Sequence, residues 1–136
     1  MTKILLDTNA FTAYFRGEKT VFDALSAADR VFVSVFVLGE LLAGFKSGSR
    51  EKANRDVLRR FLEKSTVEVL GATEETAECF ALVKNSLDKA GTPIPMNDVW
   101  IAAHALETGT VLVTFDVHFG RVPGLRLWDH APSPKD

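Results

Sequence analysis

Four carboxylates stand alone in otherwise uncharged stretches of the sequence. Each is the only Asp, Glu, Lys or Arg in its stretch. The acids are Asp7 in residues 4–15, Glu40 in 31–45, Asp98 in 92–106 and Asp116 in 108–120. Burying an ionised carboxylate without compensation is costly, and gathered carboxylates repel one another and retain protons. Either distant basic side chains or a bound cation must offset such a cluster. An all-oxygen site suits Mg²⁺ or Mn²⁺, so the pattern predicts a divalent-metal centre.

Simpler roles exist for three of these acids. Asp7 and Asp116 could be turn residues, and Asp98 could cap a helix, with Asn97 as its competitor for that role. Glu40 is flanked by leucines within a predicted helix, where a carboxylate cannot cap. The joint pattern of four acids is therefore stronger than any single member.

The elements that must position these acids follow from apolar patterning. Short apolar or β-branched runs predict strands at 4–6, 31–35, 67–70, 111–114 and 126–128. Helical spacing and caps predict helices at 9–15, 21–28, 36–45, 50–64, 73–90 and 98–108, the last capped by Asn97. Glu68 alternates with valines, which predicts an edge strand with one solvated face.

Strands that alternate with helices predict an α/β fold with a central, mainly parallel sheet and right-handed crossovers. Asp7 and Asp116 each follow a strand, Asp98 begins a helix, and Glu40 lies about two turns into the helix after the second strand. In parallel sheets, ligands bind beyond the carboxyl ends of the strands. We therefore expect all four acids at that edge.

Length and composition indicate one soluble globular domain, over residues 1–131, with a frayed tail at 132–136. The 136 residues include 16 basic and 18 acidic ones, so the net charge of −2 does not advertise a nucleic-acid partner. One cysteine excludes an internal disulfide and a cysteine-based zinc cluster. Neither a signal peptide nor a membrane span is predicted, and we expect a cytoplasmic protein.

Four motifs, in this order, resemble the PIN-domain family and its VapC-type toxins of bacterial toxin–antitoxin pairs. They are Leu6-Asp7-Thr8-Asn9, Val37-Leu38-Gly39-Glu40-Leu41, Asn97-Asp98-Val99-Trp100-Ile101-Ala102-Ala103 and Val113-Thr114-Phe115-Asp116-Val117-His118-Phe119. The likeness covers nearly the whole chain. Family members often have a polar residue where Phe115 stands, which makes Asp116 the weakest match.

The resemblance implies an α/β/α sandwich and a Mg²⁺- or Mn²⁺-dependent endoribonuclease that acts as a toxin. It implies a homodimer silenced by a small antitoxin whose tail lies over the active site. Carried over by position, Asp7, Glu40, Asp98 and Asp116 become catalytic metal ligands. Asn9 and Thr114 become supporting polar residues around them.

Other residues have more than one interpretation. Residues 46–64 hold seven basic side chains, and Arg50, Arg55 and Arg59 could guide RNA phosphates or simply form a solvated helix face. His104 is expected to be packed or partly exposed, and His118 to stabilise the final loop, rather than to bind the ion. The aromatic face of Phe11, Tyr14 and Phe15 is either core or a docking surface for an antitoxin or a second subunit.

Two other functional classes compete with the nuclease. A non-catalytic PIN-like module that binds RNA or protein would not need all four acids. A haloacid-dehalogenase-like phosphatase needs a second Asp two residues after Asp7, where Asn9 stands. A response-regulator receiver needs a paired acid before the strand-end Asp and a late Lys, and the sequence has neither.

Overall fold

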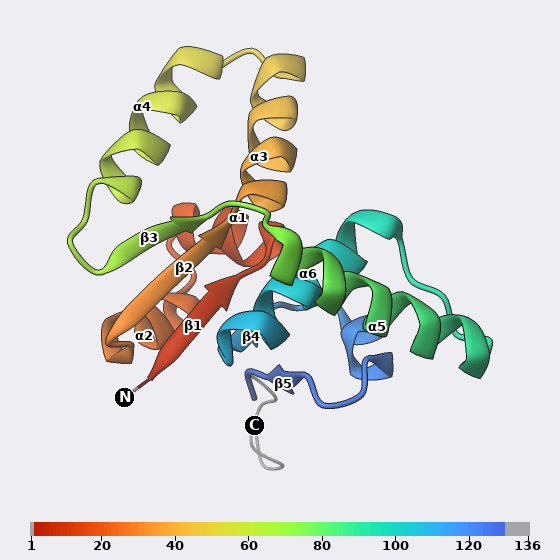
Figure 1. Cartoon of the computed structure of the whole chain (residues 1–136). Coiled ribbons are helices and arrows are strands. Elements are labelled where there is room, and N and C mark those ends of the chain that lie inside the picture. The colour runs from red at the N-terminus through yellow and green to blue at the C-terminus, as the bar shows by residue number, and fades with distance from the viewer. Residues whose placement is uncertain (1, 130–136) are drawn as a thin grey trace, which may run out of the picture.

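A computed structural model describes residues 2–129, so the predicted frayed tail at 132–136 lies outside the described residues. Five strands form one sheet in the order β3-β2-β1-β4-β5, and every strand pair within residues 2–129 is parallel (Figure 1). The strands are β1 (Lys3–Leu6), β2 (Arg30–Ser34), β3 (Val67–Leu70), β4 (Val111–Val113) and β5 (Arg126–Leu127).

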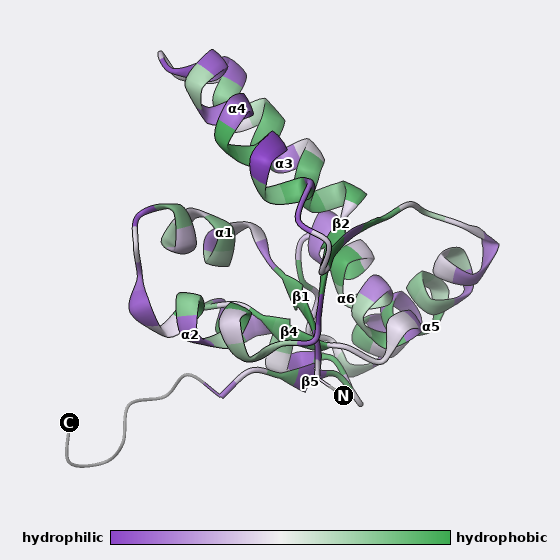
Figure 2. Ribbon diagram, turned by 90° about the vertical axis from the view of Figure 1, so that its left-hand side faces the viewer, coloured by the Kyte–Doolittle hydropathy of each residue, from purple (hydrophilic) through white to green (hydrophobic). Residues whose placement is uncertain are grey.

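Helices cover both faces of this sheet. They are α1 (Thr8–Phe15), α2 (Lys19–Ala27), α3 (Val35–Ser47), α4 (Glu51–Leu62), α5 (Glu74–Ala90) and α6 (Met96–Thr108), with a 3₁₀ helix η1 (Val117–Arg121). Helices α1 and α2 lie on one face and α5 and α6 on the other, while α3 and α4 form a hairpin that projects from the carboxyl end of β2 (Figures 1 and 2). The predicted three-layer α/β/α sandwich is confirmed.

Strand β1 occupies the centre of the sheet. Its Ile4, Leu5 and Leu6 are buried, and Leu5 pairs with Phe32 on one side and Leu112 on the other. A strand with both faces covered by helices reads as a continuous apolar run, as this one does (Figure 2). The residue that follows β1 is therefore held by the most buried part of the sheet.

Strand β3 is at the edge, as the alternation around Glu68 predicts. The carboxylate of Glu68 is exposed and forms an ion pair with Arg30 of the neighbouring strand at 2.5 Å. The negative charge of Glu68 is thus compensated by a basic neighbour.

The structure differs from the sequence predictions at two places. Helix α6 begins at Met96 with Pro95 at the N-cap, so Asn97 lies inside the first turn and does not cap it. The fixed φ of proline suits a helix start without a side-chain cap. The short helix η1 was not predicted from the sequence. Among the described helices, none is both long and apolar enough to cross a membrane.

The buried His104 links three elements near the carboxyl edge. Its Nδ1 lies 2.8 Å from Ser34 Oγ, and its Nε2 lies 3.0 Å from the carbonyl oxygen of Gly71. Because a carbonyl can only accept, Nε2 carries the proton and Nδ1 accepts from the Ser34 hydroxyl. Ser34 Oγ in turn accepts from the backbone N–H of Phe36 and so caps α3. The expectation that His104 is packed is confirmed.

Burial lowers the pKa of His104 below its ordinary value of 6.5. The unfolded chain therefore binds a proton that the folded chain resists, and the free energy of unfolding should fall as the pH drops below about 6.5. We predict that wild type loses stability relative to His104→Gln between pH 7.5 and 5.5, by at most about 1.4 kcal/mol per pH unit. Urea titrations across this range measure the difference, and parallel curves for the two proteins would contradict it.

Candidate active site

Asp7 is held at the carboxyl end of the central strand. Its backbone N–H donates to the carbonyl oxygen of Val113 at 2.9 Å, which continues the pairing of β1 with β4. Its Oδ1 accepts from the N–H of Thr8 at 2.9 Å and caps α1, and its Oδ2 accepts from the Thr114 hydroxyl at 2.7 Å. The side chain is 5% exposed. Asp7 therefore caps α1 and is also a nearly buried carboxylate. Its capping role does not exclude a role in the acid cluster.

Glu40 reaches the same place from α3. Its Oε1 accepts a hydrogen bond from the Thr8 hydroxyl at 2.6 Å, so the residue after Asp7 ties α1 to α3. The carboxylate itself is exposed. This contact places Glu40 beside Asp7 although 33 residues separate them in the chain.

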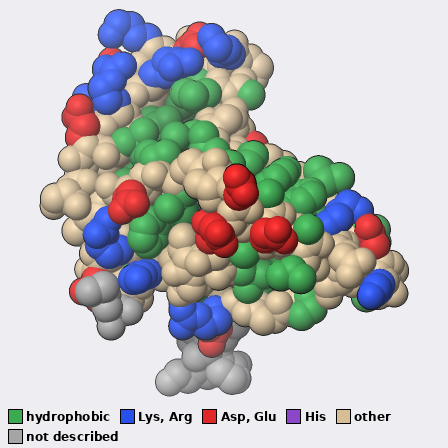
Figure 3. Space-filling model, in the orientation of Figure 1, with side chains coloured by type: hydrophobic (Ala, Val, Ile, Leu, Met, Phe, Trp, Pro, Cys, Tyr) green, Lys and Arg blue, Asp and Glu red, His purple; other side chains and the backbone are tan. Residues whose placement is uncertain are grey.

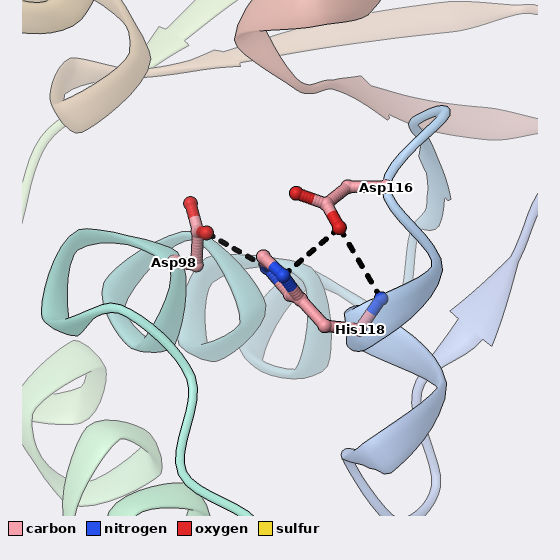
Figure 4. Close-up of side chains that lie close together, drawn as sticks. All are labelled: Asp98, Asp116 and His118. Atoms are coloured by element: carbon pink, nitrogen blue, oxygen red, sulfur yellow. Dashed lines mark hydrogen bonds and ion pairs between the residues drawn. The ribbon is translucent and has the colours of Figure 1, made fainter.

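Asp98 and Asp116 are joined by the imidazole of His118 (Figure 4). His118 Nε2 lies 2.8 Å from Asp98 Oδ2, and Nδ1 lies 2.9 Å from Asp116 Oδ1. Asp98 comes from the first turn of α6, whereas Asp116 caps η1 by accepting from the N–H of His118 at 3.3 Å. One side chain thus sets the separation of two predicted metal ligands.

The four acids surround one open hollow of about 490 Å³, which we call the acidic hollow. Its lining residues are Asp7, Thr8, Asn9, Thr12, Arg16, Glu40, Asp98 and Asp116. One carboxylate oxygen each from Asp7, Glu40 and Asp98 lie within 4.8 Å of one another, and so do ligand atoms of Asp98, Asp116 and His118. Asp98 belongs to both groups and lies between them.

The electrostatics of the hollow favour a cation. Burial raises the pKa of Asp7 from 3.8 to about 6; hydrogen bonds from Thr114 and Thr8 work against this shift, and the charges of Asp98 and Glu40 add to it. Burial also raises the pKa of Asp98, which the hydrogen bond from His118 partly offsets. Within residues 2–129, none of the four acids forms an ion pair with Lys or Arg. Their oxygens are the donor type that Mg²⁺ and Mn²⁺ prefer, so the residues present fit such an ion.

Asn9 and Thr114 organise the loop that carries Asp116. Asn9 Oδ1 accepts from the N–H of Phe115 at 3.2 Å, and Thr114 Oγ1 accepts from the N–H of Asp116 at 3.0 Å. Phe115 packs edge-to-face against Trp128, and the neighbouring Asp116 lines the hollow.

A family model for the PIN domain matches residues 4–125. This chain belongs to the PIN domain family.

The PIN domain has curated relatives of nearly the same length. It is 32% identical over 126 residues to "Ribonuclease VapC4" of Mycobacterium tuberculosis, covering 92% of this chain and 95% of the relative. It is 32% identical over 132 residues to "tRNA(fMet)-specific endonuclease VapC" of Salmonella typhimurium, covering 95% and 98%.

Solved structures of toxin–antitoxin complexes share its fold. The VapBC2 structure from Rickettsia felis, bound to a promoter DNA fragment, matches with a TM-score of 0.83 at 26% identity and covers 93% of this chain and 98% of that one. The VapBC-1 structure from nontypeable Haemophilus influenzae matches with the same TM-score at 28% identity, covering 94% and 98%.

The basic residues proposed to guide RNA do not line the acidic hollow of this PIN domain. Arg55 forms an ion pair with Glu51 at 3.1 Å and Arg59 with Asp56 at 3.4 Å, while Arg50 precedes α4. In Figure 3, basic side chains gather over the end of the α3–α4 hairpin, away from the acidic group near the middle of the face.

Sequence reasoning missed the bridge made by His118 and the presence of Arg16, Thr8 and Thr12 around the hollow. His118 was expected to stabilise the final loop, and its bonds to Asp116 are consistent with that role. Its contact with Asp98, 20 residues away, has no sequence signal. Thr8 and Thr12 of α1 and its C-cap Arg16 could have been found from their spacing of four, which places them on one helical face.

Removing the Thr114 hydroxyl should raise the pKa of Asp7 further. The hydrogen bond from Thr114 favours the ionised form, so Thr114→Val should move the pKa of Asp7 above about 6, measured by carboxyl ¹³C NMR on metal-free protein. Thr12→Val is the matched control, because its hydroxyl lines the hollow but donates to the carbonyl oxygen of Thr8. An unchanged pKa in Thr114→Val, or an equal rise in Thr12→Val, would contradict the assignment.

Proposed function

We propose that this protein is a divalent-metal-dependent endoribonuclease that acts as the toxin of a toxin–antitoxin pair. The observation that carries the proposal is the convergence of Asp7, Glu40, Asp98 and Asp116 on one hollow with no Lys or Arg paired to them within residues 2–129. The relatives named as ribonucleases, and the VapBC complexes that share the fold, support the reaction and the setting.

The chemistry needed is hydrolysis of a phosphodiester bond. Bound Mg²⁺ or Mn²⁺ would supply water activation and charge neutralisation at the leaving oxygen. Asp7 and Asp98 would hold the principal ion, because both are partly or fully buried and Asp98 lies between the two ligand groups. Glu40 is exposed and free to accept a proton from the attacking water. Asp116 and its partner His118 keep the far side of the hollow in place.

The partners follow from the same family. We infer a homodimer, an RNA substrate, an antitoxin partner and a cytoplasmic location. Two cavities beside α1, α2 and α4 share Tyr14, Phe22, Phe61 and Lys64, and Phe22 is 55% exposed. This surface suits an apolar segment of the antitoxin. Phe11 cannot contribute to it, because its side chain is buried against Phe61.

The basic residues of the α3–α4 hairpin have a secondary role in this proposal. Arg50 has no side-chain hydrogen bond or ion pair within residues 2–129 and could contact distant RNA phosphates. Arg55 and Arg59 would have to exchange their helical ion pairs for phosphates, which weakens their contribution.

Metal binding should stabilise the folded protein. A ligand that binds only the native state at 100 times its Kd adds about 2.7 kcal/mol, so saturating Mn²⁺ should raise the Tm and EDTA should reverse the rise. Asp98→Asn should abolish most of the shift because Asp98 serves both ligand groups. Glu78→Gln, which removes an exposed carboxylate of α5, is the control and should keep it. Differential scanning calorimetry measures all three, and no Mn²⁺ shift in wild type would contradict the metal site.

Cleavage of RNA should require Asp7. Asn caps a helix as well as Asp does, so Asp7→Asn should fold while losing the ligand charge. Loss of a residue that only supports a metal ligand costs 10–100-fold, so loss of the ligand itself should reduce cleavage by at least about 100-fold. The test maps cuts in total RNA with Mg²⁺, using Asp23→Asn, an exposed acid of α2, as control. Equal cutting by wild type and Asp7→Asn would favour a binding module without catalysis and a contaminating nuclease.

A further inference from the structure

One basic side chain lines the acidic hollow, and the catalytic scheme above does not use it. Within residues 2–129, Arg16 is the only Lys or Arg among the lining residues. It is exposed, and its guanidinium makes no hydrogen bond or ion pair with any described residue. A cation beside four carboxylates would ordinarily pair with one of them, so its free state needs a reason.

Arg16 does not serve as an internal counter-ion for the acids. Within residues 2–129, its guanidinium forms no ion pair with any of the four acids, and Asp98 and Asp116 contact the imidazole of His118 instead. The charge of Arg16 is therefore directed to something other than the carboxylates of this chain.

Backbone hydrogen bonds fix the position of the Arg16 Cα atom. It follows α1 as its C-cap, with its N–H donating to the carbonyl oxygens of Thr12 and Ala13 at 3.1 and 3.2 Å. Gly17 then leaves the helix with a φ of 87°, a conformation that favours glycine. The Cα of Arg16 is thus anchored while its side chain stays uncommitted.

Asn9, Thr12 and Arg16 form a polar stripe along α1. Their spacings of three and four place them on one face, and all three line the hollow. The Cα atoms of Asn9 and Arg16 lie roughly 10 Å apart along the helix axis at 1.5 Å per residue. The stripe therefore leads from the acid cluster to the positive charge of Arg16. An extended substrate bound at the acids could place its next charged group near that side chain.

An RNA strand presents such a group. An ion held by the acids would compensate the charge of the phosphate at the cluster, whereas flanking phosphates would meet a negative surface and need a separate positive charge. Arginine binds phosphate oxygens with two parallel N–H bonds, and a free guanidinium pays no cost for breaking an existing pair. The ion-paired Arg55 and Arg59 of α4 lack this advantage.

We propose that Arg16 binds a phosphate of the RNA that flanks the scissile one and so positions the strand across the acidic hollow. The inference rests on the proposed nuclease function and adds a substrate-binding residue to it. Arg16 takes no part in metal binding or proton transfer.

The test compares cleavage of a single-stranded RNA oligonucleotide by wild type, Arg16→Ala, Arg16→Lys and Lys3→Ala. Lys3 is the matched control: it is an unpaired cation within the described residues, at the other end of β1 from Asp7. Arg16→Ala should raise KM about tenfold or more, the effect of losing a charged hydrogen bond. The slope of log kcat/KM against log salt should become shallower by about one, as for one lost phosphate contact.

Arg16→Lys should fall between wild type and Arg16→Ala, because lysine keeps the charge and loses the paired donors. All variants should keep the wild-type rise in Tm with Mn²⁺. A KM and salt slope for Arg16→Ala equal to those of Lys3→Ala would overturn the inference, and so would loss of its Mn²⁺ shift. Absence of cleavage by wild type itself would instead reject the nuclease function.

Discussion

Parallel pairing of the central strand is the constraint on which the site depends. Strand β1 lies between β2 and β4, and all three end at the same edge. Asp7 follows β1, Thr114 follows β4, and Ser34 ends β2 and caps the helix that carries Glu40. Segments more than 100 residues apart therefore meet within hydrogen-bond distance, as the bond from Thr114 to Asp7 shows. A slip of one residue in either pairing would turn Asp7 to the other face of the sheet.

This arrangement has an electrostatic cost, because it brings carboxylates close together and partly buries them. Among the described residues, no arginine forms a salt bridge with the acids, and the site is not fully solvated. The acids are held by hydroxyls, backbone N–H groups and one imidazole. Hydroxyl and backbone N–H donors orient carboxylates without cancelling their charge, and burial raises the pKa of Asp7. The site is thus built so that a proton or a metal ion can complete it.

The sequence predicted the sheet, its edges and the four acids because each depends on local signals. A short apolar run followed by an acid needs no long-range information, and Glu68 could be set apart from the others by its alternation with valines. His118 and Arg16 could not be placed in the same way. The contact of His118 with Asp98 depends on how η1 packs against α6. Whether Arg16 forms an ion pair depends on the positions of the acids around its side chain. Asn97 was misassigned because a polar residue before an apolar run signals a cap, whereas Pro95 already begins α6 without one.

The buried imidazole of His104 has a consequence for genetics. It ties the start of α3 to α6 and to the turn after β3, and these two helices carry Glu40 and Asp98. A substitution of His104 should therefore displace both acids together, although His104 does not itself line the hollow. In a random mutagenesis screen scored by survival of the host, inactive alleles at position 104 would therefore resemble alleles of Glu40 and Asp98, although the imidazole does not line the acidic hollow.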